Sequence, residues 1–209
     1  MLGRDKLCSF LYRLKGQSGS IRKILQKAVM LLPDSNHEYQ RLKHRYRGTT
    51  PYRVVHNGID PGMFKSSGPV QKKDRLVISV ARIEGLKNQL NVIRALNGTK
   101  YRLLLIGSPA PGQLSYYRLC RKTAKSNVEF INHIPRQELV QYYQKAKVHI
   151  LASWFETTGL SSLEAAAMGC NVVITDRDAK EYFHDVASYC DPASPASIYA
   201  AVEKSASSL

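Results

Sequence analysis

Two carboxylates near a predicted helix start are the residues of this sequence that point most directly to chemistry. Glu156 stands in a predicted loop, and Glu164 follows about one turn into the helix after it. The neighbours of Glu164 are Leu160, Leu163 and a run of alanines, so its carboxylate needs a hydrogen-bond partner. The hydroxyl pair of a ribose would serve. The alternative, that Glu164 is a solvated acid on a helix, stays open.

Two cations follow an apolar segment that precedes these residues in the chain. Arg82 stands at the carboxyl end of residues 77–81, and Lys87 follows five positions later, where a helix is expected to begin. Two cations beside one crevice can hold a diphosphate between them. An ordinary pair of surface cations is the alternative.

The predicted helix after Glu156 opens with Gly159, Leu160 and Ser161. A helix start presents unpaired backbone N–H groups and the positive end of the helix dipole, which together favour a phosphate. Gly159 lets a ligand approach closely, and Ser161 can add a hydroxyl. The same residues also fit a plain helix start with serines near its cap.

Strand and helix patterns that would position these residues alternate from about residue 75. The strand-like segments are mostly apolar at successive positions, as in parallel strands that are covered on both faces. They are residues 76–80, 101–106, 128–131, 148–152 and 172–175, with a weaker one at 187–190.

Helical patterns lie between these segments. They cover residues 88–96, residues 136–146 after Pro135, and residues 160–168 before Gly169. This alternation predicts an α/β fold, a doubly wound Rossmann-like parallel sheet with helices on both faces. Ligands of such sheets bind at the carboxyl ends of the strands.

The chain divides by composition into three parts. Residues 51–74 are rich in turn formers and are expected to form a linker and the start of the second domain, which would be residues 75–209. Residues 1–50 are basic, with 11 Lys and Arg against 3 Asp and Glu. Within residues 20–47 we expect a helical stretch, a short strand at 28–32 and a basic helix after Ser35.

The formal net charge of +15 on 209 residues implies attraction to anions. A solvated basic face, contact with an anionic membrane surface or binding of nucleic acid would each explain the charge, although no nucleic-acid module accompanies it.

No apolar run is long enough to span a bilayer, and residues 1–16 do not form a secretory signal. Cysteines at 8, 120, 170 and 190 are expected to be reduced, and no zinc-ligand spacing is present. Residues 107–112 do not fit the dinucleotide fingerprint.

Taken together, these residues resemble the donor-binding domain of the family 4 glycosyltransferases, which have the two-domain GT-B fold. The resemblance runs almost continuously from about residue 28 to 205. It rests on four motifs in the family's order, namely VVHNGID (54–60), VARIEGLK (80–87), NVEFINHI (127–134) and the pair of glutamates within residues 153–169.

The resemblance implies a role for each candidate residue. Arg82 and Lys87 would neutralise the diphosphate of the donor, with Gly159, Leu160 and Ser161 at the helix start, so no metal and no cofactor would be needed. Glu164 would hold the ribose hydroxyls. Glu156 would face the transferred sugar as the catalytic carboxylate. His133 and Ile134 would contact the base through backbone groups.

The implied enzyme is a retaining hexosyltransferase that uses a UDP-, GDP- or ADP-sugar and a glycan or lipid acceptor. It would work in the cytoplasm, with the inner face of the membrane as a peripheral contact.

The sequence also departs from the family pattern. Only residues 28–46 resemble the acceptor-binding domain, and we expect the family's last helix to be cut off at Leu209. Residues 176–182 replace a commonly glycine-rich stretch, which leaves the sugar open. We therefore expect a fragment or a split enzyme with a separate acceptor-domain chain. The alternative is a non-catalytic module that binds a membrane surface or nucleic acid.

Overall fold

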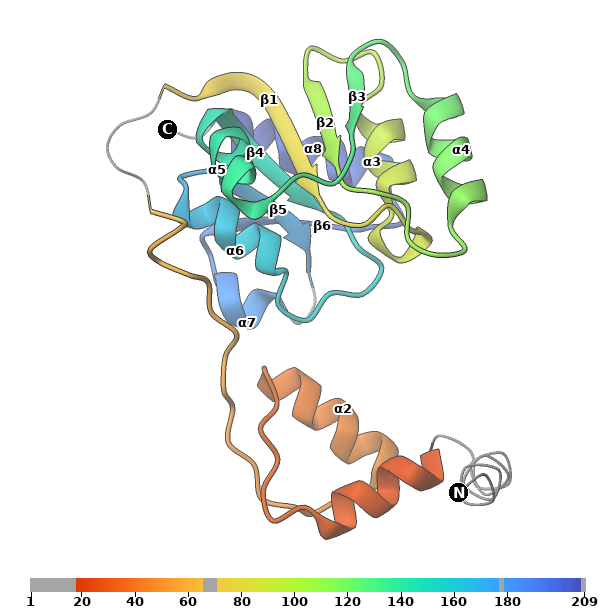
Figure 1. Cartoon of the computed structure of the whole chain (residues 1–209), viewed down its shortest axis with the longest axis vertical. Coiled ribbons are helices and arrows are strands. Elements are labelled where there is room, and N and C mark those ends of the chain that lie inside the picture. Colours follow the sequence, from red (N-terminus) through yellow and green to blue (C-terminus); the bar gives the residue numbers. More distant parts are fainter. Residues whose placement is uncertain (1–17, 66–70, 177–178, 208–209) are drawn as a thin grey trace. The chain divides into compact units, whose positions relative to one another are not determined.

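The chain contains two compact units, and it passes from the first to the second between His56 and Asn57. The structure, a computed structural model, describes residues 18–65, 71–176 and 179–207 (Figure 1). The boundary between the units falls inside the predicted segment 51–74. Residues 1–16 with Cys8, the turn formers at 66–69 and residues 177–178 of the segment 176–182 lie outside the described residues.

The first unit contains two helices, one over residues 18–27 and the second, α2, over Asn36–Tyr46. Ser35 caps α2, because its hydroxyl accepts a hydrogen bond from the backbone N–H of Glu38 at 3.1 Å. The predicted strand at 28–32 is wrong. In that segment only Leu31 pairs, in a single parallel bridge with Tyr52, and one bridge does not make a ladder.

The second unit is built on one parallel sheet of six strands in the order β3-β2-β1-β4-β5-β6. This order is typical of a dinucleotide-binding fold, and it reverses direction beside β1. The chain runs from β1 into β2 and β3 on one side and then crosses over to β4 on the other. The strands are β1 (Lys73–Val80), β2 (Arg102–Ile106), β3 (Val128–Ile131), β4 (Ala146–Leu151), β5 (Asn171–Thr175) and β6 (Ala187–Cys190).

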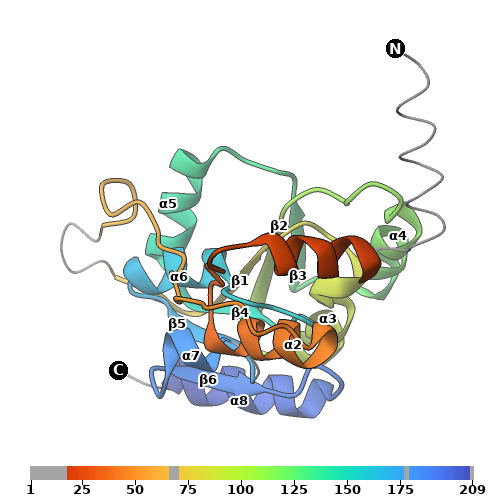
Figure 2. The ribbon, with the colours of Figure 1, turned by 90° about the horizontal axis from the view of Figure 1, so that it is seen from below.

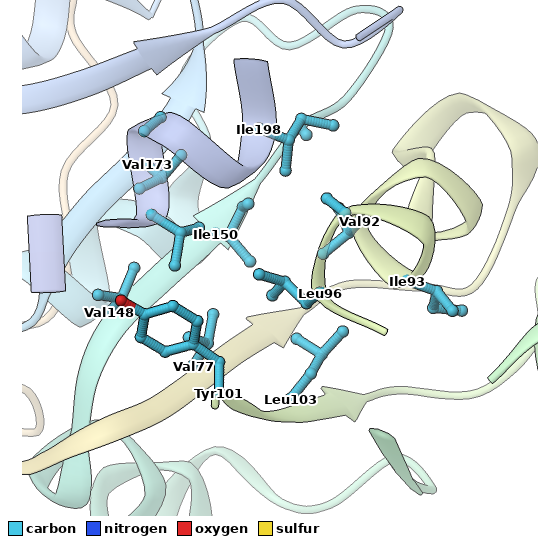
Figure 3. Packing of buried hydrophobic residues seen from close by; sticks show 14 of the residues in the cluster. Val77, Val92, Ile93, Leu96, Tyr101, Leu103, Val148, Ile150, Val173 and Ile198 are labelled. Atoms are coloured by element: carbon cyan, nitrogen blue, oxygen red, sulfur yellow. The ribbon is translucent and has the colours of Figure 1, made fainter. Parts of the chain in front are cut away.

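Helices cover both faces of this sheet, as predicted (Figure 2). Val77 of β1 packs into one core with α3 and α8 (Figure 3), whereas its neighbours Leu76 and Ile78 pack into the other with α5 and α6. The alternation follows from the strand's period of two. The helices are α3 (Gln89–Leu96), α4 (Leu114–Thr123), α5 (Arg136–Lys145), α6 (Leu160–Ala167), α7 (Lys180–Phe183) and α8 (Pro195–Ser207).

The six predicted strands all form, with ends that differ by a few residues; β1, for example, begins at Lys73. No helix was predicted for the segments that form α4, α7 and α8. In α4 only Cys120 is buried, so the apolar stripe that would reveal the helix is narrow. Within the described residues, no helix combines the length and apolar character needed to cross a bilayer.

Candidate functional site

The loops after β1 and β4 are joined by hydrogen bonds that position the candidate residues. The backbone N–H of Trp154 donates to the carbonyl of Leu86 at 2.9 Å. The side-chain amide of Asn88 donates to the carbonyls of Ala152 at 3.0 Å and Pro192 at 2.8 Å. Asn88 has φ 58°, a conformation that asparagine tolerates better than most residues. Because Lys87 lies between Leu86 and Asn88, these bonds place it beside the loop after β4.

Lys87 forms an ion pair with Glu156, with 2.7 Å between Nζ and Oε2. The hydroxyl of Ser153 donates to the same oxygen at 3.2 Å. Both charged side chains are largely buried, at 19% exposed for Lys87 and 12% for Glu156. The structure therefore brings together one predicted phosphate-binding cation and the predicted catalytic carboxylate. Lys87 lies beside the helix start as expected: it ends a short 3₁₀ turn, η1 (Gly85–Lys87), and α3 begins two residues later.

A pocket of about 280 Å³ lies over this ion pair, and we name it the β1–β4 pocket. The predicted helix start contributes Gly159, Leu160 and Ser161 to its wall. Gly159 has φ 68°, and a Cβ there would lie 3.0 Å from Ile174 Cδ1, so the tight turn into α6 requires a glycine. The complete lining is Asn57, Val80, Ala81, Lys87, Leu151, Glu156, Thr157, Thr158, Gly159, Leu160 and Ser161.

A buried histidine of the sheet contacts the first turn of α6. His149 of β4 lies 3.2 Å from the hydroxyl of Ser162 through its Nδ1, and both side chains are fully buried. Burial lowers the pKa of His149 to about 3, so the ring is neutral at physiological pH. Its Nε2 has no hydrogen-bond partner within the described part of the chain.

A second pocket, of about 320 Å³, lies on the other side of β1, and we name it the β1–β2 pocket. His133 and Ile134 line it together with apolar residues of the neighbouring loops. Gly107 is required here, because a Cβ would lie 2.1 Å from the carbonyl oxygen of Ala81. The complete lining is Val80, Ala81, Arg82, Ile106, Gly107, Ser108, Pro109, Ala110, Pro111, His133, Ile134 and Leu139.

Arg82 lies on the β1–β2 side, apart from the pocket that Lys87 lines. Its side chain is 68% exposed and pairs with Glu84, with 3.2 Å between Nη2 and Oε1. Its carbonyl accepts a hydrogen bond from the side chain of Gln89 at 2.8 Å. The two predicted cations therefore flank the carboxyl end of β1, one in each pocket, instead of lining a single crevice.

Glu164 is almost fully buried, at 5% exposed, and both of its carboxylate oxygens have partners from α5. Arg136 donates to Oε1 in an ion pair, and the hydroxyl of Tyr143 donates to Oε2 at 3.1 Å. Burial, with the nearby carboxylate as a further cause, raises the pKa of Tyr143. The expectation that Glu164 is buried and needs a partner is confirmed, and two side chains of this chain satisfy it.

A half-buried lysine, Lys72, bonds to both α5 and α6 and so supports this contact. The Lys72 ammonium donates to the carbonyls of Tyr143 at 2.8 Å and Met168 at 2.7 Å, near the carboxyl ends of the two helices. Burial lowers the pKa of Lys72. A cation at two helix ends is favourable because the helix dipole is negative there.

Four residues that shape the site were not predicted from the sequence. They are Arg136 and Tyr143, the partners of Glu164, and Asn57 and Thr158, which bond to each other at 3.0 Å in the wall of the β1–β4 pocket. The apolar setting of Glu164 signalled that a partner was needed, and the spacing of seven between Arg136 and Tyr143 puts both on one helix face. Neither signal shows that Glu164 pairs with Arg136 and Tyr143.

The described cysteines, Cys120, Cys170 and Cys190, are free and buried, and burial raises the pKa of each. Over residues 18–65, 71–176 and 179–207, no three His, Cys, Asp or Glu side chains are grouped so that they could hold a metal ion.

Solved structures share this fold over most of the chain. The crystal structure of HepE from Anabaena, in complex with UDP and glucose, has a TM-score of 0.77 and 15% identity, and the match covers 92% of this chain and 58% of that one. Sucrose-phosphate synthase from Thermosynechococcus elongatus has a TM-score of 0.75 and 20% identity, covering 88% of this chain and 50% of that one.

Curated relatives match at the level of sequence. An uncharacterized 41.2 kDa protein in the cps region of Klebsiella pneumoniae is 26% identical over 165 residues, which are 73% of this chain and 44% of the relative. The D-inositol 3-phosphate glycosyltransferase of Acidothermus cellulolyticus is 27% identical over 143 residues, which are 58% of this chain and 32% of the relative. The chain thus spans less than half the length of these relatives.

The family model for glycosyl transferases group 1 matches residues 63–205. This range contains the six strands of the sheet and the residues that line both pockets except Asn57. The chain therefore belongs to the family of glycosyl transferases group 1.

Proposed function

We propose that this chain binds a nucleoside-diphosphate sugar at the carboxyl end of β1 and serves the transfer of that sugar to a glycan or lipid acceptor. One observation carries the proposal: two unlike pockets flank the same strand end. The β1–β2 pocket is mostly apolar, whereas the β1–β4 pocket has an ion pair and a helix start. A nucleotide sugar has the same division, with a flat base at one end and a charged, hydroxyl-rich portion at the other.

In this proposal the base occupies the β1–β2 pocket against His133 and Ile134. The diphosphate lies across Val80 and Ala81, the two residues that both pockets share. Arg82 approaches it from one side and Lys87 from the other, while the N–H groups at the start of α6 point toward it. The ribose hydroxyls reach Glu164, and the sugar faces Glu156.

Catalysis would come mainly from stabilising the departing diphosphate. As the bond between the anomeric carbon and the diphosphate oxygen breaks, negative charge grows on that oxygen. The Lys87 ammonium has three donors, so it can bond to Glu156 and to a phosphate oxygen at once. Glu156 can then stabilise positive character at the anomeric carbon. We propose retention of configuration and independence from metal ions, as in the family 4 enzymes that the sequence resembles.

The comparisons support this proposal at the level of the family and the fold. HepE has UDP and glucose bound, and the Acidothermus relative is a glycosyltransferase that is named for an inositol phosphate. The match in the cps region of Klebsiella supports a role in polysaccharide synthesis.

Titration calorimetry of the full chain with UDP, GDP and ADP tests the proposal. We expect one diphosphate to bind, and Lys87→Ala or Arg82→Ala to weaken it about tenfold or more, since a charge-assisted hydrogen bond contributes about 1.5–3 kcal/mol. Lys100→Ala is the matched control, because Lys100 also pairs with a glutamate, Glu203 at 3.1 Å, but lines neither pocket. Absence of binding, or equal loss in all three variants, would contradict the donor site.

The basic residues 1–50 favour a second candidate function, attachment to an anionic surface. In the described part of this segment, α2 has Lys43, His44 and Arg45 in its last turn. Co-sedimentation with anionic vesicles and with RNA at two salt concentrations separates the candidates. Strong, salt-sensitive binding without any effect of nucleotides would favour a non-catalytic binding module.

A further inference from the structure

Glu164, the carboxylate proposed to bind the ribose hydroxyls, already has hydrogen-bond partners in two side chains of α5. Tyr143 holds Oε2 of Glu164, and Arg136 holds Oε1. A ribose that bonds to Glu164 must therefore replace or share one of these partners. The two differ in how easily they can move.

Tyr143 cannot move away without opening the core. Its side chain is fully buried, and it lies edge-on to Phe64 and His149, with ring centroids 6.0 Å away in each case. Arg136 is different, because its side chain is 56% exposed. The guanidinium lies 5.4 Å from the ring centroid of Phe64, with its outer side in solvent. Only Arg136 can withdraw at little cost in packing.

The place of Arg136 in the helix is also unfavourable in itself. It is the first residue of α5, where the helix dipole is positive, and a cation there is disfavoured. Its charge is compensated by Glu164 of another helix, with Asp60 as a weaker neighbour. Arg136 also follows Ile134, which lines the β1–β2 pocket, by two residues, and its guanidinium pairs with the buried carboxylate.

We propose that Arg136 is a specificity-determining residue that competes with the ribose hydroxyls for Glu164. A ribonucleotide displaces the guanidinium from Oε1 while Tyr143 keeps Oε2. A nucleotide without ribose hydroxyls leaves the ion pair closed and gains nothing from Glu164. Arg136 thereby sets how much the ribose hydroxyls add to affinity. The inference rests on the proposed donor site.

The test is titration calorimetry of the full chain with the diphosphate that binds and with its 2′,3′-dideoxy analogue. Arg136→Gln keeps a donor near Glu164 but removes the competing charge. In this variant we expect the ratio of ribonucleotide affinity to dideoxy-analogue affinity to rise about 3- to 10-fold above its wild-type value. This is the range for loss of one partly exposed, charge-assisted contact. The ratio of the two affinities is the readout, because loss of a cation near an anionic ligand weakens both ligands alike.

Arg102→Gln is the matched control. Arg102 has the same exposed fraction of 56% and the same kind of partner, but that partner, Glu129, is not proposed to contact the ribose. We expect this variant to leave the ratio unchanged. In Glu164→Gln the ratio should fall toward one, and adding Arg136→Gln to that variant should then have no further effect.

Three outcomes would overturn the inference. An unchanged ratio in Arg136→Gln means that Arg136 does not compete with the ribose. A lower ratio means that Arg136 instead supports the ribose or orients Glu164. Binding of no diphosphate by the wild-type chain removes the proposed donor site as well, whereas the first two results leave that site intact.

Discussion

Lys87 Nζ lies 2.7 Å from Glu156 Oε2, although the two residues are 69 positions apart and follow different strands. The loop contacts of Asn88 and Trp154 on either side hold the pair together. The cation proposed for the diphosphate and the carboxylate proposed for the sugar are thus coupled before any ligand binds. A change in one must alter what the other can do.

Glu156→Gln should separate binding from sugar recognition. Removal of the carboxylate frees Lys87 and removes a negative charge near the diphosphate, so we expect the affinity for the nucleoside diphosphate to rise about 2- to 10-fold, or 0.4–1.4 kcal/mol. The additional affinity that the sugar confers should fall. Calorimetry with the diphosphate and with its sugar conjugate measures both effects.

Ser153→Ala is the control for this variant, because it removes a hydrogen bond to Glu156 and keeps the charge. It should change the diphosphate affinity much less. Weaker diphosphate binding by Glu156→Gln would show that the carboxylate orients Lys87 productively and does not compete for it.

Gly159→Ala should destabilise the second unit and weaken diphosphate binding. The left-handed backbone costs an alanine about 1–2 kcal/mol. The added Cβ would also lie 3.0 Å from Ile174 Cδ1 and 3.4 Å from Ser162 Oγ. Gly112→Ala is the control, because Gly112 has a similar φ of 75° with nothing within 4 Å of a Cβ. Urea denaturation should show a larger loss for Gly159→Ala, by about 1 kcal/mol, and equal losses would contradict the packing argument.

His149 should make stability depend on pH. Burial lowers its pKa from 6.5 to about 3, so below pH 6.5 the unfolded chain binds a proton that the folded chain excludes. The free energy of unfolding therefore falls as the pH falls from about 6.5 to 3, by up to about 1.4 kcal/mol per pH unit. Above pH 6.5 this residue makes no difference.

Denaturation of wild type and His149→Phe at pH 7, 6 and 5 measures this contribution. The variant should lose stability less steeply toward acid, because phenylalanine takes up no proton in either state. Parallel curves for wild type and His149→Phe would mean that His149 takes up a proton in the folded chain.

The buried thiols should not react in the folded chain. The pKa values of Cys120 and Cys170 are raised to about 11 and that of Cys190 to about 12, so little thiolate exists at pH 8. In a Cys8→Ser background, we expect no labelling by a thiol reagent without denaturant and three labelled thiols in urea. Rapid labelling of one native thiol would show that its part of the core opens.

Much of the fold could be predicted because its signals are local. Strands that are buried on both faces need successive apolar residues, and residues 76–80, 101–106 and 172–175 show this pattern. Short helices with few buried residues, such as α4, lack such a signal. The predicted strand at 28–32 was wrong. An apolar run indicates only that burial would be favourable, whereas in this structure the segment is not covered and Val29 is 89% exposed.

The local sequence was enough to place Arg82 after a strand and Glu156 in a loop. It also placed Lys87 and Gly159 beside helix starts, because all these positions follow from neighbours a few residues away. The tertiary structure decided which strand ends meet. With β1 between β2 and β4, Lys87 reaches Glu156 while Arg82 faces the other pocket. It also decided that Arg136 satisfies Glu164. A buried carboxylate needs a hydrogen-bond donor, which the local sequence can indicate. Which donor lies beside it depends on how α5 packs against α6.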